Sequence, residues 1–129
     1  MKLYCWNVNG IRAVVKKATF QKFIAEHQPD ILLVTPLIEL GSPQLDYVRA
    51  ARALGIRSAL CVWSWDHLSS KALIRDMPQR VFVWNDTQKD AAVRLHAVPP
   101  ERVVVTGAQC YDQWFGRQPV RTREAFCAR

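Results

Sequence analysis

Short apolar runs with strand character alternate along this sequence with segments of helical spacing, and no other feature limits the fold as much. The strand-like runs are Lys2–Val8, Ile31–Thr35, Arg57–Trp63, Arg80–Trp84 and Arg102–Thr106. Alternation of this kind, with short connections, predicts βαβ units, right-handed crossovers and a mostly parallel sheet. We therefore expect an α/β fold, a Rossmann-like three-layer sandwich whose sheet has about five strands.

The segments between these runs have helical start and stop signals. Thr19–His27 has apolar residues at i, i+3 and i+4 spacing. Ser42 is suited to cap a second helix, and Gly55 is suited to end it. Asn85, with Gln88 three residues later, resembles a capping box before a third helix.

Length and composition indicate a globular chain. Its 129 residues fit one domain, and 50% of them are hydrophobic while 22% are charged. The apolar runs are strand-sized, far below the roughly 20 residues of a membrane helix. No signal-peptide core opens the sequence. We expect a protein of the cytoplasm that does not enter a membrane.

The chain is basic, with a formal net charge of +7 and a pI near 9.6. Such a charge favours polyanions, and weak nonspecific binding to nucleic acid is one expectation. The basic residues are scattered rather than gathered in one run, however, so a solvated basic surface is the alternative.

The cysteines and histidines do not have the spacing of a metal site. No pair among Cys5, Cys61, Cys110 and Cys127 forms C-x-x-C, and the three histidines stand far apart. The five glycines form neither G-x-G-x-x-G nor a Walker loop. We expect no resident metal and no cofactor. His27 and His96 lie near predicted helix C-termini, where a cationic ring suits the dipole.

The N-terminal sequence MKLYCWNVNGIRAVV resembles the opening of the exonuclease III family of AP endonucleases. The resemblance covers residues 1–32 and implies that Asn7 acts beside an acidic Mg²⁺ ligand after the second strand. Pro36 stands where that ligand would be, which removes a carboxylate that the ion needs. Mg²⁺ would therefore matter only if the chain were a nuclease after all. The alternative for Asn7 is a cap on the Asn9-Gly10 turn.

Residues 33–129 resemble the first-domain portion of a bacterial glycosyltransferase-like family with the GT-B architecture. Four short motifs carry this resemblance: Val34-Thr35-Pro36, Ser64-Trp65-Asp66, Val83-Trp84-Asn85 and Val105-Thr106-Gly107-Ala108-Gln109. His67 stands where the family pattern has Asn, and Ala72 where it has Gly. The resemblance implies a chain that lacks the second GT-B domain.

Together the two resemblances describe a chimera-like chain, in which the nuclease-like segment meets the glycosyltransferase-like segment at residues 31–34. GT-B catalysis takes place in a cleft between two domains. One domain alone cannot provide the positioning of the substrates and the stabilisation of charge that the reaction needs. We expect a catalytically incomplete fragment. If the chain has an activity, we expect a glycosyltransferase-like activity in preference to a nuclease-like one. The alternatives are a Mg²⁺-dependent AP endonuclease and a basic, non-catalytic nucleic-acid-binding module.

The candidate site residues follow the third strand-like run. Asp66, His67 and Lys71 lie beyond its C-terminal end, which is the edge where open α/β sheets bind ligands. Asp66 could act as a general base, with His67 and Lys71 contacting substrate. The alternative is an N-cap aspartate beside a surface lysine.

Tryptophans gather near the predicted strand ends, at positions 63, 65 and 84, and Trp114 and Phe115 lie near the C-terminus. They could stack on sugars or bases, or pack in the core and its rim. In a domain that lacks its partner, apolar side chains of this size are left uncovered. We therefore expect self-association through an uncovered apolar surface.

Overall fold

The computed structural model of the protein describes residues 19–35, 37–38, 41–42, 44–71 and 73–128. Within this part, four parallel strands form one sheet in the order β1-β2-β3-β4. The strands are β1 (Ile31–Val34), β2 (Arg57–Cys61), β3 (Arg80–Val83) and β4 (Val103–Val105). The expected α/β fold with a parallel sheet is confirmed, and the further strand expected at Lys2–Val8 lies outside the described residues.

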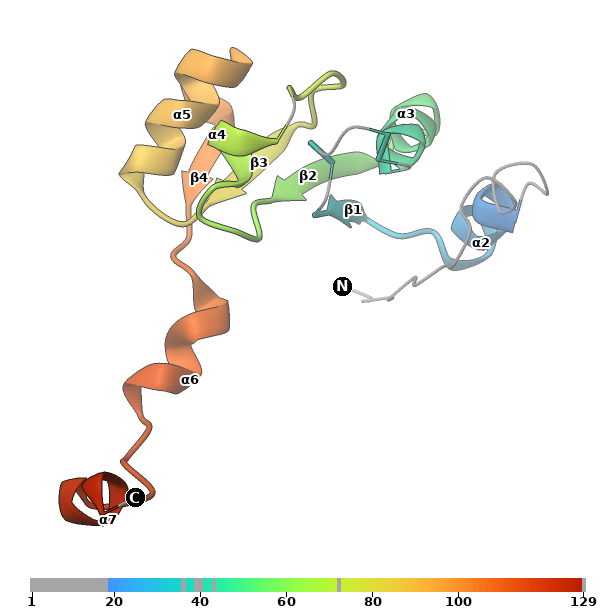
Figure 1. Ribbon diagram of the computed structural model, residues 1–129. Helices are drawn as coiled ribbons and strands as arrows, with labels where there is room; N and C mark the ends of the chain where they lie inside the picture. Colours follow the sequence, from blue (N-terminus) through green and yellow to red (C-terminus); the bar gives the residue numbers. More distant parts are fainter. Residues whose placement is uncertain (1–18, 36, 39–40, 43, 72, 129) are drawn as a thin grey trace.

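Helices alternate with these strands as the sequence pattern predicts (Figure 1). The α-helices are α2 (Thr19–His27), α3 (Gln44–Ala53), α4 (His67–Ser70), α5 (Asp86–His96), α6 (Asp112–Phe115) and α7 (Arg123–Cys127). Two short 3₁₀ turns, Pro100–Arg102 and Gln109–Tyr111, flank β4.

Strand order decides where the helices lie. Each strand pairs with the next one along the chain, from β1 to β4, and the order never reverses. Right-handed crossovers that always advance in one direction place every crossover on the same face of the sheet. Accordingly, Val48 of α3 and Ala92 of α5 belong to one buried cluster with Val34, Leu60 and Val83. This cluster is the core.

The opposite face of the sheet carries apolar side chains that the described residues leave partly uncovered. Leu33 and Val104 alternate with the core-facing residues of their strands and are 49% and 37% exposed. The expected three-layer sandwich needs helices on this face as well, and the described residues supply none there. In the described part of the chain, α3 and α5 cover one face because the order from β1 to β4 does not reverse.

Helix α3 begins and ends where the sequence predicts. The Ser42 Oγ accepts from the backbone N–H of Gln44 at 3.3 Å, and Gly55 follows the helix with φ +70°. The N–H of Ile56 then bonds back to the carbonyl of Ala51 at 2.8 Å, which satisfies a carbonyl of the last turn.

The segments on the two sides of the predicted join at residues 31–34 pack together. Ile24 of α2 and Tyr47 of α3 are both 7% exposed and form a small cluster with Leu32 of β1. β1 pairs in register with β2 across its whole length. The join is therefore compatible with one continuous fold.

His96, at the end of α5, is buried and ties the helix to the segment around α4. Its Nδ1 accepts from the backbone N–H of Ile74 at 3.2 Å, and its Nε2 lies 2.7 Å from the carbonyl oxygen of Leu68. Since Nδ1 accepts, the ring proton sits on Nε2 and is donated to Leu68. His96 ends its helix as the sequence predicts, but it serves as an internal hydrogen-bonding bridge rather than as a surface cation.

Replacing His96 by leucine should destabilise the protein by about 2 kcal/mol or more, because it leaves two buried backbone groups without partners at about 1–3 kcal/mol each. Chemical denaturation monitored by circular dichroism would measure this. The neighbouring substitution Leu95→Ala is the control, since Leu95 is 48% exposed. Equal losses in the two variants would contradict the bridging role.

Candidate functional site

The polar edge of the sheet is formed where its parallel strands end. Thr35 follows β1, the segment 62–66 follows β2, the segment 84–86 follows β3, and Thr106 follows β4. Because parallel strands all end on the same side, these segments line one edge. Ligands of open α/β sheets bind at such an edge.

Asp66 is held at this edge by hydrogen bonds to both of its carboxylate oxygens. The hydroxyl of Ser64 donates to its Oδ1 at 2.7 Å, and the hydroxyl of Ser70 donates to its Oδ2 at 2.8 Å. Lys71 Nζ lies 3.8 Å from the same Oδ2. Asp66 precedes α4 but makes no side-chain cap bond to that helix. The structure thus brings Asp66 and Lys71 together, and two serines that the sequence did not single out complete the group.

These bonds set the charge state of Asp66. The hydroxyls of Ser64 and then Ser70, with a smaller contribution from Lys71, hold the pKa of the Asp66 carboxyl below its usual range. Its side chain is 27% exposed, so it remains open to solvent. A carboxylate of lowered pKa is a poor proton acceptor, which favours a hydrogen-bond acceptor for hydroxyl groups over a general base.

His67, the other predicted contact residue, is fully buried at 0% exposed. Its ring packs edge-on against Trp63, with centroids 6.0 Å apart. Contact between His67 and a ligand would require this loop to open. Trp63 and Trp65, in contrast, are 51% and 77% exposed beside Asp66.

Gln88 fixes the loop that carries Asp66. Its Oε1 accepts from the N–H of Trp84 at 2.8 Å, and its Nε2 donates to the carbonyls of Ser64 and Trp65 at 3.0 and 3.3 Å. The sequence predicted a capping box here, and half of it is confirmed, since Asn85 Oδ1 accepts from Gln88 N–H at 2.9 Å. The Gln88 side chain bonds across the sheet edge instead of back to Asn85.

The nuclease-like residues cannot be compared with this geometry, because Asn7 and Pro36 lie outside the described residues. Within the described part of the chain, no three His, Cys, Asp or Glu side chains are grouped so that they could hold a metal ion.

In the same part, no helix is long and apolar enough to cross a membrane.

A shallow groove lies on the uncovered face of the sheet, next to the polar edge. Leu33, Cys61, Phe82, Trp84 and Thr106 line it, together with Gln109. Burial raises the pKa of the Cys61 thiol. The groove is therefore largely apolar, and a partly buried cysteine thiol is among its lining residues.

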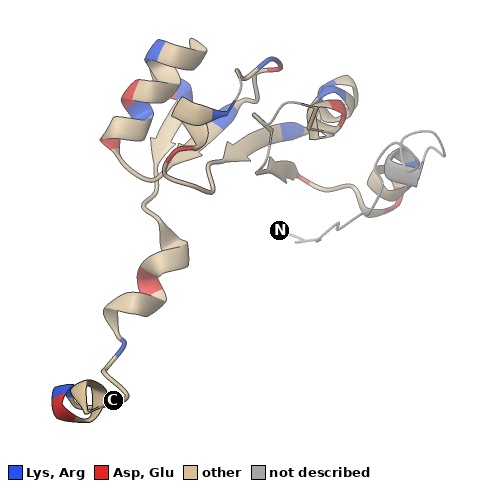
Figure 2. Ribbon diagram, in the orientation of Figure 1, with Lys and Arg blue, Asp and Glu red and all other residues tan. Residues whose placement is uncertain are grey.

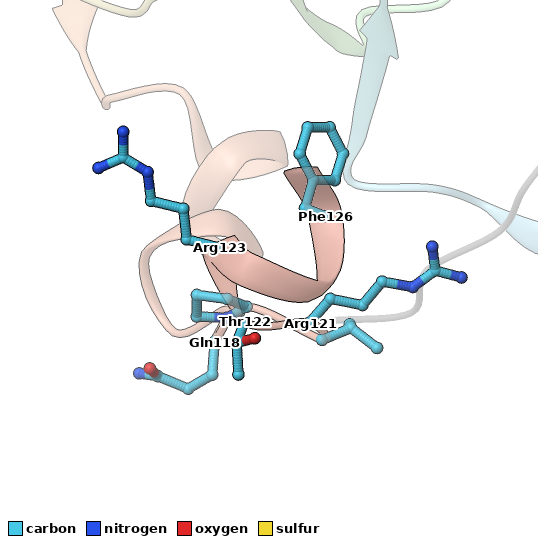
Figure 3. Close-up of a pocket in the computed structure, with 7 residues that line it drawn as sticks. Gln118, Arg121, Thr122, Arg123 and Phe126 are labelled. Atoms are coloured by element: carbon cyan, nitrogen blue, oxygen red, sulfur yellow. The ribbon is translucent and has the colours of Figure 1, made fainter. Parts of the chain in front are cut away.

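A second hollow lies far from the sheet, around α7. Gln118, Thr122 and Phe126 line it, with Arg121 and Arg123 (Figure 3). The two arginines and the phenylalanine point in different directions and do not converge. This hollow lacks the convergent polar groups of a small-molecule site.

Comparison with known proteins adds no identification. No protein family, no curated protein and no solved structure matches the chain significantly. The resemblances drawn from the sequence motifs therefore stay predictions.

Gln88→Glu should destabilise the protein by about 1–3 kcal/mol, because a carboxylate would face the two carbonyls that Gln88 now donates to. Thr87→Glu is the matched control: Thr87 is exposed in the first turn of the same helix, where an acid is favourable. Urea denaturation would compare the variants. A Gln88→Glu protein as stable as the control would refute the role given to this side chain.

Asp66→Asn should lower the free energy of unfolding near neutral pH and have less effect in acid. The folded-state pKa of Asp66 is depressed, so its contribution is present above the unfolded-state value of about 3.9 and is lost as pH falls through the folded value. Denaturation at a series of pH values would test this. Ser64→Ala should shrink the pH-dependent difference, whereas a difference constant with pH would contradict the assignment.

Proposed function

We propose that this chain is one α/β half of a GT-B-like glycosyltransferase, which supplies one wall of a sugar-binding cleft and does not complete the reaction alone. One observation carries the proposal. The four motifs of the GT-B resemblance begin in Val34, Ser64, Val83 and Val105, which lie at or just after the ends of β1, β2, β3 and β4. Motifs separated by about twenty residues or more thus share one edge of the sheet.

The chemistry of that edge suits a sugar better than a phosphate. Asp66 presents an ionised carboxylate with two serine hydroxyls already bound to it, and sugar hydroxyls are donors of the same kind. Trp63 and Trp65 are exposed beside it, and exposed aromatic rings are suited to stack on sugar rings. In this proposal Asp66 holds an acceptor hydroxyl, and Lys71 orients the carboxylate.

The same geometry explains why turnover by the chain alone is not expected. Glycosyl transfer needs a group that takes the acceptor proton and cations that stabilise the departing phosphate. Asp66, with its lowered pKa, is unsuited to the first task, and Lys71 is already engaged with Asp66. A cytoplasmic location, expected from the sequence, stays a prediction.

Saturation-transfer NMR with a panel of simple sugars and nucleotide sugars would test the site. We expect weak sugar binding that Asp66→Asn reduces severalfold and that Asp90→Asn, on the exposed side of α5, leaves unchanged. Sugar binding that is equal in both variants would refute the site.

Two activity assays on the same protein address the alternatives. No release of nucleoside diphosphate from the nucleotide sugars is expected, and measurable turnover would overturn the proposal that this chain does not complete the reaction alone. Mg²⁺-dependent nicking of abasic-site DNA would favour the nuclease instead. A gel-shift series at rising salt would test the nucleic-acid-binding module, and no binding at low salt would remove it.

A further inference from the structure

The C-terminal arm, residues 107–128, extends away from the sheet (Figure 1). Every residue from 109 to 128 is exposed. The arm nevertheless carries large apolar side chains: Trp114 is 56% exposed, Phe115 88%, Val120 98% and Phe126 71%. Large apolar side chains with this much exposure are suited to contact with another protein.

The base of the arm is anchored at the polar edge of the sheet. The N–H of Thr106 donates to the carbonyl of Val83 at 2.8 Å. The ring of Tyr111 then meets Trp84 edge-on, with centroids 5.5 Å apart. These contacts hold the start of the arm against the end of β3, and beyond them the arm leaves the sheet with its apolar side chains exposed (Figure 1).

The uncovered sheet face is the second half of the argument. Leu33, Cys61, Phe82 and Val104 form this open face, and the groove on it reaches Trp84 and Thr106 at the polar edge. Four strands of about four residues cover only about 250 Å² at the usual strand spacing and rise. Two such faces packed together would bury about 500 Å², well below the roughly 1,200 Å² of a stable interface.

We propose that two copies of this chain form a twofold dimer in which the arm of each copy covers the open face of the other. The same surfaces then meet twice, as a closed twofold dimer requires. Three aromatic side chains and a valine per arm, with the face and rim that they cover, bring the buried area to about 1,500–2,000 Å² in total. The arms thus supply the area that the faces lack.

Charge favours this partner over a polyanion. The described arm holds three arginines, at 117, 121 and 123, and two acids, Asp112 and Glu124, so its net charge is only +1. The guanidinium carbon of Arg117 lies 4.0 Å from the ring centroid of Trp114, so one of the three positive charges is paired with a ring of the arm. Figure 2 marks the charged positions. An arm with many aromatic rings and little net charge is suited to an apolar protein surface.

Sedimentation velocity from low micromolar to near-millimolar protein would test the dimer. We expect a concentration-dependent dimer, and Trp114→Ser or Phe115→Ser should raise its dissociation constant about tenfold or more. Leu54→Ser is the matched control, because Leu54 is 50% exposed at the end of α3, on the helix side of the sheet. Circular dichroism would verify that each variant keeps its fold.

The rate at which Cys61 is alkylated identifies the covered face. Cys61 lines the groove of the open face, whereas Cys127 lies exposed in the arm. Peptide mapping should show that Cys61 is protected as the dimer forms and that Phe115→Ser abolishes this protection. A monomer at all concentrations, a dimer unaffected by the arm substitutions, or a dimer that leaves Cys61 equally reactive would each overturn the proposal.

Discussion

The handedness of the crossovers, applied to a strand order that never reverses, accounts for most of the described molecule. Because each crossover is right-handed and each strand is added beside the previous one, α3 and α5 lie on the same face of the sheet. Two consequences follow. One face of the sheet is buried beneath the helices, while the other keeps Leu33 and Val104 partly exposed.

The same parallel arrangement gathers the polar groups. All the strands end on one side, so residues that are distant in sequence become neighbours there. Ser64, Asp66 and Ser70 form a hydrogen-bonded group at this edge, and Gln88 joins their loop to the start of α5. Fixed hydroxyl donors hold the pKa of Asp66 low, which makes it a steady acceptor rather than a base. Binding, more than catalysis, is the chemistry that such a group supports.

The position of the candidate site could be predicted, but its detailed contacts could not. The strand pattern places Asp66 and Lys71 just after a strand, and in the structure Lys71 Nζ lies 3.8 Å from Asp66 Oδ2. The serines and Gln88 were missed as site residues because a serine two or four residues from an aspartate is common in loops. The Asn85 cap was predicted because its bond is local. The burial of His67 and His96 gave no local signal, since it depends on how α4 and α5 pack.

The sequence by itself predicts the elements whose signals are local. These are the strands β1 to β4, the helices α2, α3 and α5, the Ser42 cap and the Gly55 terminus. Their signals lie within one or two turns, where backbone hydrogen bonding and side-chain spacing are decided. Which face of the sheet α3 and α5 cover could not be predicted in this way, because it depends on which strand pairs with which. The open face and the Gln88 bridge also became visible only in the folded chain, because they depend on contacts between residues about twenty or more positions apart.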